Sequence, residues 1–445
     1  MIIYFAITNF KSFRDRTQFN MLAGNYKRFP EHIYTGFTPN ILRCTAMYGS
    51  NAAGKSNFIL AVEVLKNIVL GLFELENQEI PFFRLDEECK HLPTKFEVEF
   101  ETNKHRYSYS ISILNNKIIE EWLYKVFDNN KTEVVFERIV NEGKTKLKVG
   151  GNKRLSQKEQ LRLEIYAEEL NKRSVTPFIL YGMEREIEII KEPFFWFLNN
   201  LQVVRPNYYY PRIVESFESN LAFARLANQI VNALNLGIKN IKVEAIPIDD
   251  FFGKGDETRK KEILDELAGG EYDGMNFEKD GILYSVYKNK NNEINVARLV
   301  TIHDGIKRDV QFELNEESTG TQKIIGLLPA IINAILNKAV VLYDEIETSV
   351  HPCVIKELIK IYLDAGSEYE GQLIFSTHEC NLLDLDFFRQ DEIWFTEKDD
   401  SGVSHIYSLS DFKPRFDKDI RKGYLEGQFN QIPFFTEPEK LNWNL

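Results

Sequence analysis

The stretch "YGSNAAGKSNF" (48–58) is where residue types and spacing first suggest a specific chemistry. It contains the pattern G-x-x-x-x-G-K-[ST], carried by Gly49, Gly54, Lys55 and Ser56. Glycines let a backbone approach phosphates closely, a lysine reaches the β- and γ-phosphates, and a serine hydroxyl binds Mg²⁺. The pattern predicts a loop that binds the phosphates of a nucleoside triphosphate. The alternative is a chance match on a glycine-bearing turn.

The elements expected around this loop are the ones that such a loop needs. Before it, "ILRCTAMYG" (41–49) has the apolar composition of a buried strand. After it, apolar residues recur at helical spacing from Lys55 to Leu72. We therefore expect a strand, a phosphate-binding loop and a helix in succession. The loop residues expected to contact nucleotide are Gly49, Ser50, Asn51, Ala52, Ala53, Gly54, Lys55, Ser56 and Asn57.

A pair of carboxylates follows another apolar run, in "KAVVLYDEIETSVHP" (338–352). A buried strand that ends in two adjacent carboxylates is typical of the Walker B arrangement. Asp344 is then expected to hold Mg²⁺ together with Ser56, and Glu345 to orient the attacking water. The alternative, a strand that simply ends in a charged turn, is less favoured once the phosphate loop is present.

A histidine ends a third apolar strand, in "QLIFSTHECNLLD" (372–384). At the end of a strand beside the Asp-Glu strand, His378 could contact the γ-phosphate and the water. The alternative is an ordinary core or surface histidine. Its position relative to the other motifs favours the functional interpretation.

The stretch "NEESTGTQKIIGLLPAI" (315–331) opens a predicted helix with small, hydroxyl-rich residues. A helix N-terminus with exposed N–H groups binds anions, so Ser318 and Gly320 are candidate phosphate contacts. An ordinary N-cap by Ser318 or Thr319 is the other interpretation. Capping and phosphate binding are compatible, and the sequence does not choose between them.

Composition and charge limit the class of protein. The 445 residues suggest about two domains, and a net charge of −12 argues against a broadly basic nucleic-acid surface, although not against a local basic groove. The longest apolar stretch, "IIGLLPAIINAIL" (324–336), is too short to span a bilayer. No signal peptide is expected, so we predict a cytoplasmic protein without a membrane segment. The four cysteines lack CxxC spacing and are expected to be reduced thiols: Cys44, Cys89, Cys353 and Cys380.

The pattern along the chain indicates an α/β protein. Residues 95–140 are rich in alternating strands, a charged helical region begins near 155, and the final third alternates helix and strand. The expected divisions are a first ATPase lobe with a β-rich part (1–150), a helical insertion (151–240), a β-rich return segment (241–310), a second ATPase lobe (311–412) and a C-terminal tail (413–445).

In this order the four motifs resemble the ABC-type ATPase heads of the SMC and RecF group. The chain looks most like the AAA15 family of bacterial ATPases, related to the Rlo-type, abortive-infection and PARIS anti-phage ATPases. The resemblance is carried by the four motifs together with "ITNFKSFRD" at the start, "DEIWFTEKDDSGVSHIYSLSDF" (391–412) and "RFDKDIRKGYLEGQFNQIP" (416–433). It covers residues 1–60 and 310–433, and is thin across 150–280.

The resemblance implies an ABC-type head, a P-loop NTPase of two lobes, that uses ATP and Mg²⁺. Each ATP would lie between two copies of the chain, which form a homodimer or a higher oligomer. The isolated chain would then be a poor ATPase. One copy supplies Lys55, Ser56, Asp344, Glu345 and His378, and the other supplies Ser318 and Gly320. The catalytic residues in this arrangement are Glu345 and His378.

The implied role is anti-phage defence, in which the ATPase responds to a phage-encoded trigger and controls a separately encoded nuclease of Toprim or Rlo type. A clamp of the RecF kind, which grips DNA, and a scaffold that never hydrolyses ATP are the alternatives. Three features depart from the family pattern. The signature reads Glu317-Ser318-Thr319-Gly320, Glu347 stands where relatives usually have aspartate, and no glutamine of the Q-loop can be placed.

Overall fold

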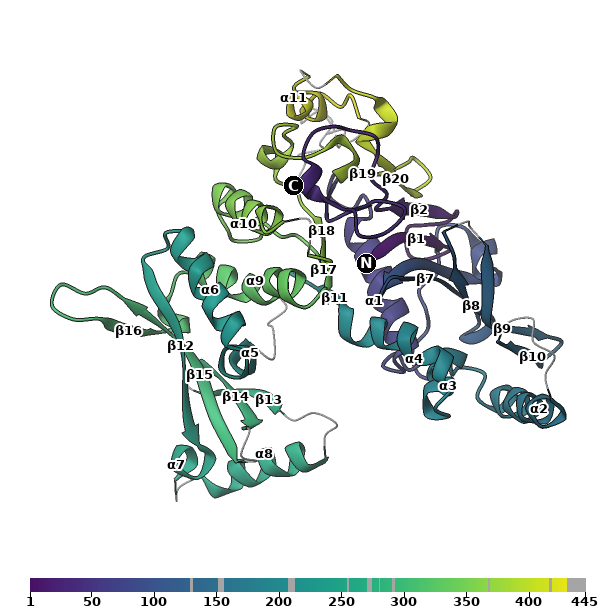
Figure 1. Ribbon diagram of the computed structural model, residues 1–445, viewed down its shortest axis with the longest axis horizontal. Helices are drawn as coiled ribbons and strands as arrows, with labels where there is room; N and C mark the ends of the chain where they lie inside the picture. Colours follow the sequence, from purple (N-terminus) through teal and green to yellow (C-terminus); the bar gives the residue numbers. More distant parts are fainter. Residues whose placement is uncertain are drawn as a thin grey trace, which may run out of the picture. The chain divides into compact units, whose positions relative to one another are not determined.

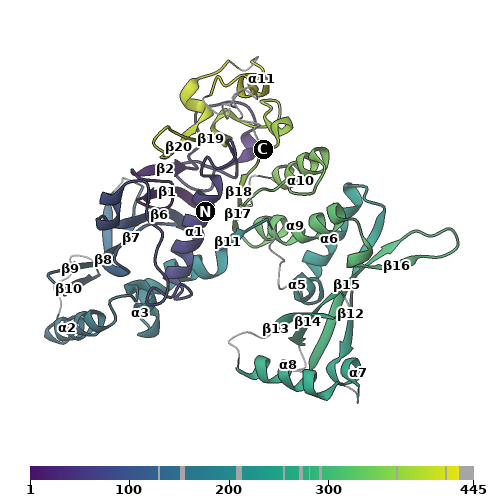
Figure 2. The same ribbon diagram turned by 180° about the vertical axis from the view of Figure 1, so that it is seen from behind.

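The computed structural model describes residues 1–128, 131–150, 156–206, 213–253, 256–269, 274–279, 281–289, 293–366, 369–415 and 418–429. The chain forms two compact units (Figures 1 and 2). The first unit contains Met1–Arg205, Asn337–Ile346 and Ala365–Leu445, and the second contains Pro206–Leu336 and Glu347–Asp364. Each unit is therefore assembled from segments that are distant in the sequence.

A six-stranded sheet forms the centre of the first unit. Its strand order is β11-β17-β18-β5-β19-β20, and all neighbours are parallel except β20, which is antiparallel to β19. Every residue of β5, β17 and β18 is buried, as expected for strands of a parallel sheet that is covered on both faces. The strands are β11 Leu201–Val204, β17 Val340–Tyr343, β18 Gln372–Ser376, β5 Cys44–Tyr48, β19 Ile393–Lys398 and β20 Ser404–Ser408.

A seven-stranded antiparallel sheet, in the order β10-β9-β8-β7-β6-β1-β2, packs in the same unit. Helix α1 (Lys55–Val69) lies against it, with the ring of Phe58 5.7 Å from Phe5 and 5.1 Å from Phe19 (Figure 1). One hydrophobic core joins α1 to both sheets, so the start of α1 is held in a fixed place. The strands are β1 Ile2–Thr8, β2 Thr17–Asn20, β6 Thr94–Thr102, β7 His105–Leu114, β8 Lys117–Val126, β9 Thr132–Asn141 and β10 Lys144–Val149.

The remaining elements of the first unit are short strands and helices. Helix α2 begins with a capping box between Ser156 and Glu159, and α4 runs into a π-helical turn at Trp196–Asn200. Strand β11 of the parallel sheet lies within the segment that the sequence suggested as a helical insertion. These elements are β3 Ile33–Tyr34, β4 Ile41–Leu42, α2 Gln157–Lys172, α3 Phe178–Glu184, α4 Glu188–Phe195 and α11 Ile420–Leu425.

The second unit is built on a five-stranded antiparallel sheet in the order β12-β15-β14-β13, with β16 also pairing with β15. Helix α6 packs on β12 and on α9 (Figure 2). The strands are β12 Ile238–Pro247, β13 Gly274–Lys279, β14 Ile282–Lys288, β15 Ile294–His303 and β16 Val310–Glu313. The helices are α5 Ile213–Ser219, α6 Leu221–Ala233, α7 Ile248–Phe252, α8 Glu257–Gly269, α9 Thr319–Leu336 and α10 Pro352–Asp364.

Helix α9 is longer than the apolar stretch that the sequence singled out. Its 18 residues make it, within the described ranges, the one helix long and apolar enough to cross a membrane. However, 61% of that helix is buried inside the protein. Its apolar residues pack among α5 and α6 of the same unit, which is the behaviour of a core helix.

The α/β fold class expected from the sequence is confirmed by the parallel sheet and its flanking helices. The helix that begins at Lys55 and the strands that end before Asp344 and His378 also lie where the sequence placed them. The C-terminal tail predicted at 413–445 lies partly outside the described residues. Residues 416–417 and 430–445 are not described.

Candidate nucleotide site

Three sequence motifs meet at one edge of the parallel sheet in the first unit. Strands β17, β18 and β5 are consecutive neighbours and run parallel, so their carboxyl ends lie at the same edge. Gly49 follows β5, Asp344 and Glu345 follow β17, and His378 follows β18. Ligand sites of open α/β sheets lie at this edge. The structure thus brings together the first-unit residues that the sequence predicted.

The loop before α1 has the shape of a phosphate cradle. Lys55 is only 4% exposed, and its Nζ donates hydrogen bonds to the carbonyl oxygens of Gly49 (2.7 Å) and Ser50 (3.2 Å). Ala52 and Gly54 have positive φ angles of 63° and 123°. A loop in which right-handed and left-handed backbone conformations alternate turns successive N–H groups toward one point, where they bind an anion. The loop therefore fits the polyphosphate of a nucleotide, with Lys55 at its centre.

Two serines from distant parts of the chain support the back of this loop. The Oγ of Ser404 lies 2.6 Å from the carbonyl oxygen of Ala53 and 2.7 Å from the Oγ of Ser12. Ser12 in turn accepts a hydrogen bond from Nδ2 of Asn57 (2.8 Å), and its carbonyl accepts from the Ser404 N–H (2.7 Å). Ser12 and Ser404 lie in "NFKSF" and "GVSHIYS", so these stretches hold the shape of the loop. The sequence analysis did not assign them this role.

Gly54 has no room for a side chain, and this predicts a strong effect of substitution. A Cβ there would lie 2.5 Å from Oγ of Ser404, at a φ of 123° that L-residues rarely adopt. Such strain costs about 1–3 kcal/mol. Expressed in affinity, this predicts that Gly54→Ala weakens ATP binding by about 5- to 150-fold, measured by calorimetry. Gly326→Ala, where a Cβ would meet nothing within 4 Å, is the matched control and should bind ATP like the wild type. Equal affinity of the Gly54 variant would contradict this account of the loop.

The C-terminal helix α11 also reaches the loop. Tyr424 is 8% exposed, and its ring lies 6.1 Å from that of Tyr48 and is stacked 5.8 Å from Phe395. Burial raises the pKa of Tyr424 to about 12, against the opposing effect of a hydrogen bond with the Gly49 backbone. On the same helix, Arg421 donates a hydrogen bond to Oδ1 of Asn381 (2.7 Å). The family-like tail therefore contacts both the phosphate loop and the segment that follows His378.

Asp344 and Glu345 are held in place by their neighbours. Asp344 is 7% exposed, its N–H donates to the carbonyl of Val204 (2.9 Å), and its Oδ1 accepts from Oγ of Ser376 (2.6 Å). Glu345 has a left-handed φ of 54°, and its N–H donates to the same Ser376 Oγ (2.8 Å). One oxygen of the Asp344 carboxylate is thus used within the protein, and the other remains for a ligand.

The donor set fits Mg²⁺ bound together with a nucleotide. Ser56 is exposed at the first turn of α1, and it offers a hydroxyl, whereas Asp344 offers a carboxylate oxygen. Hard oxygen donors of this kind suit Mg²⁺, which takes one or two protein ligands and completes its shell with phosphates and water. No group of three or more His, Cys, Asp or Glu side chains able to hold a metal occurs among the described residues.

His378 directly follows Thr377, which comes just after β18 and is hydrogen-bonded to β5. The N–H of Thr377 donates to the carbonyl of Met47 (3.0 Å), and His378 is half-buried. The thiol of Cys380 donates to the His378 carbonyl (3.6 Å). The histidine is therefore carried on a short segment anchored beside the phosphate-loop strand.

The signature residues Ser318 and Gly320 belong to the second unit. Ser318 Oγ accepts a hydrogen bond from the Thr321 N–H (3.1 Å), so the capping interaction that the sequence allowed is formed at the start of α9. The preceding Glu317 is held by Nε2 of His303 (2.6 Å) and by the hydroxyl of Thr301. A Cβ at Gly320 would lie 3.1 Å from the carbonyl oxygen of Ser349. The signature turn is thus fixed from within its own unit.

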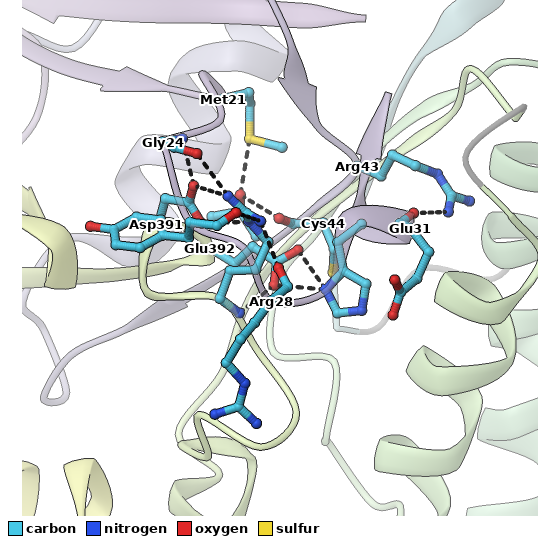
Figure 3. Close-up of polar contacts among 12 residues, drawn as sticks. Met21, Gly24, Arg28, Glu31, Arg43, Cys44, Asp391 and Glu392 are labelled. Carbon is cyan, nitrogen blue, oxygen red and sulfur yellow. Dashed lines mark hydrogen bonds and ion pairs between the residues drawn. The ribbon is translucent and has the colours of Figure 1, made fainter. Parts of the chain in front are cut away.

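A buried polar cluster, shown in Figure 3, fastens the N-terminal loop to the start of β19. The Arg389 guanidinium donates two hydrogen bonds to Asp391 (2.9 and 2.8 Å) and others to the carbonyls of Gly24 (3.0 Å) and Arg28 (2.8 Å). Asp391 also accepts from the Gly24 N–H (2.6 Å), whereas the Arg28 side chain points away from the cluster. The cluster therefore supports β19, the neighbour of the phosphate-loop strand.

The next residue, Glu392, completes this cluster on its other side. Both of its carboxylate oxygens lie 3.0 Å from Nδ1 of the buried His32, and one accepts from the Arg389 N–H (2.8 Å). Burial raises the pKa of Glu392. The neighbouring Asp386 pairs with Arg28 on the surface (2.7 Å), and its N–H donates to Asp384. Asp384 and Asp386 thus take part in contacts beside this cluster.

The family comparison adds the decisive observation. A family model described as "AAA domain, putative AbiEii toxin, Type IV TA system" matches residues 44–385. The chain belongs to this family. The match includes the phosphate loop, the signature, Asp344-Glu345 and His378, and together with the geometry above it supports ATP binding and hydrolysis as the general activity of the site. No curated protein matches the chain.

Among solved structures, the chain is similar to the SMC head domain from Thermotoga maritima. The two are 12% identical, the TM-score is 0.36, and the match covers 92% of this chain and 98% of that one. A second structure, of the SmcHead bound to the C-winged helix domain of ScpA, is 13% identical with a TM-score of 0.37, and the match covers 92% and 97% of the two chains.

Proposed function

We propose that this protein is an ATP-dependent switch of an anti-phage defence system, which controls a separately encoded effector nuclease. One observation carries the proposal. Gly49, Asp344-Glu345 and His378 follow three adjacent parallel strands, β5, β17 and β18, at one edge of the sheet. A phosphate cradle, a metal-binding carboxylate and a second carboxylate for water are the parts that ATP hydrolysis requires.

Each residue has a definite task in this mechanism. Lys55 exchanges its bonds to the loop carbonyls for bonds to the β- and γ-phosphates. Ser56 and Asp344 would hold Mg²⁺, which would supply positive charge opposite the phosphates. Glu345 orients the attacking water, and His378 contacts the γ-phosphate from the neighbouring strand.

A second copy of the chain completes the site in this proposal. Ser318 and Gly320, at the start of α9, would contact the γ-phosphate held by the first copy. A helix N-terminus offers unpaired N–H groups and a favourable dipole to an anion. ATP would close the pair of copies and hydrolysis would reopen it. A partner that binds the closed or the open state more tightly would then be bound or released as ATP is bound and hydrolysed.

The defence role is supported by the family description, which names a toxin of a type IV toxin–antitoxin system. It is also supported by the resemblance of the motifs to abortive-infection ATPases. A chain with a net charge of −12 is less suited than a basic one to a general grip on DNA. We therefore place a protein effector of Toprim or Rlo type, and not DNA, as the main partner in the cytoplasm. A phage-encoded molecule is the trigger.

The partner can be identified by trapping the ATP-bound state. We expect tagged Glu345→Gln protein, purified natively with ATP and Mg²⁺, to retain a nuclease in stoichiometric amount, identified by mass spectrometry. Lys55→Ala protein, which should not reach the closed state, is the control and should retain much less. Duplex DNA recovered with no protein partner would favour the DNA clamp instead. If both samples contain only the monomeric chain, without a partner protein, the proposed ATP-dependent switch is wrong.

A further inference from the structure

Ser376 occupies a central place in the site although no sequence motif assigned it a role. It is the last residue of β18, is fully buried, and lies opposite Met47 of β5 in the parallel register. On the other side β18 pairs with β17, whose last residue Tyr343 precedes Asp344. Ser376 therefore lies between the end of the phosphate-loop strand and the two carboxylate-bearing residues.

The hydrogen bonds of Ser376 have only one consistent proton arrangement. A serine hydroxyl has one proton to donate, and an ionised carboxylate can only accept. The Oγ must therefore donate to Oδ1 of Asp344 (2.6 Å) while it accepts from the N–H of Glu345 (2.8 Å). The Ser376 carbonyl also accepts from the N–H of Ile346 (3.2 Å). Three consecutive residues are thus tied to one side chain and its backbone.

These bonds act on both proposed chemical tasks. The bond to Asp344 fixes the carboxylate rotamer and leaves its second oxygen for a ligand. The bond from Glu345 stabilises a backbone with a φ of 54°, which is unusual for a residue other than glycine. That backbone sets the direction in which the Glu345 side chain leaves the strand. Ser376 is also only two residues before His378. A movement of His378 would therefore displace Ser376, and with it the hydrogen bonds to Asp344 and Glu345.

We propose that Ser376 is a positioning residue that aligns Asp344 with Mg²⁺ and Glu345 with the attacking water. The proposal rests on the proposed ATP hydrolysis and adds the residue that couples its metal site to its water site. A residue that orients a metal ligand through a hydrogen bond typically contributes about 10–100-fold to metal affinity. Misplacement of a reacting group by about 1 Å costs about a hundredfold in rate.

The test uses the full chain and a fluorescent ATP analogue, N-methylanthraniloyl-ATP, titrated with and without Mg²⁺. For Ser376→Ala we expect unchanged binding without the metal, and a rise of about 10–100-fold in the Mg²⁺ concentration for half-maximal tightening. We expect the ATP turnover rate to fall by about a hundredfold. Ser376→Cys keeps the side-chain size but weakens the donor, so its values should lie between those of wild type and Ser376→Ala.

Thr45→Val is the matched control, because Thr45 is a fully buried hydroxyl on the adjacent strand β5 that bonds to the Met21 sulfur (3.0 Å) and not to a carboxylate. It should change none of these quantities more than twofold. The proposal is overturned if Ser376→Ala retains wild-type Mg²⁺ dependence, or if binding is lost equally with and without the metal. If the wild-type protein binds Mg²⁺ and the analogue but does not hydrolyse ATP, the proposed hydrolysis is wrong. The Mg²⁺ titration of Ser376→Ala would still test whether Ser376 positions Asp344.

Discussion

Replacement of Glu345 by glutamine is expected to abolish most ATP turnover while nucleotide binding is retained. Glutamine has nearly the same shape, so the Glu345 N–H can keep its bond to Ser376 and the backbone its left-handed turn. What is lost is the negative charge that orients and activates water. A positioned general base contributes about 10²–10⁴-fold to a rate. Steady-state phosphate release should fall by that factor, and the affinity for ATP should stay within about threefold of the wild-type value.

A second glutamate on the same sheet provides the control for this variant. Glu397 lies on β19, which is separated from β18 by β5 in the sheet, and accepts a hydrogen bond from the Tyr407 hydroxyl (3.0 Å). Glu397→Gln makes the same change of charge and should leave turnover unchanged. If Glu345→Gln hydrolyses ATP as fast as the wild type, another group activates the water and the assignment of Glu345 is wrong.

The parts of this site that the sequence predicted share a common feature. Each motif of the first unit is a short apolar strand that leads into its functional residues, as in "CTAMY" before the phosphate loop and "VVLY" before Asp344-Glu345. Burial of the strand and the position of the residue after it are both local properties. Parallel pairing then brings the strand ends together without further information. This is why Lys55, Asp344 and His378 could be placed from the sequence.

The supporting residues could not be found in the same way, because their partners are distant in the chain. Ser404 contacts Ala53 from 351 positions away, and Ser376 contacts Asp344 from 32 positions away. A serine at the end of a strand has no pattern that distinguishes it from a solvent-exposed one. Strand β11 is a similar case, since its four residues follow a helical region directly and gain their strand structure from pairing with β17. Tertiary contacts decided these features.

Replacement of Lys55 by alanine is expected to remove most of the affinity for nucleotide. In this structure the Lys55 ammonium bonds to two carbonyls of its own loop, so it is already poised where phosphates would bind. Each charge-assisted hydrogen bond contributes about 1.5–3 kcal/mol. Two such bonds to phosphate correspond to a loss of at least about a hundredfold in affinity, measured by calorimetry with ATP and Mg²⁺. The loop carbonyls of Gly49 and Ser50 would lose the same partner, so the free protein should also become less stable.

Lys66 separates the effect on binding from the effect on stability. It lies in the last turn of the same helix α1, and its Nζ donates to the carbonyl of Leu201 (2.6 Å). Burial lowers the pKa of Lys66. Lys66→Ala would leave the Leu201 carbonyl without this hydrogen bond. That variant should melt at a lower temperature but bind ATP like the wild type. If Lys55→Ala lowered only the melting temperature, Lys55 would be a structural lysine like Lys66, and the glycine-rich loop would have to be interpreted as an ordinary turn.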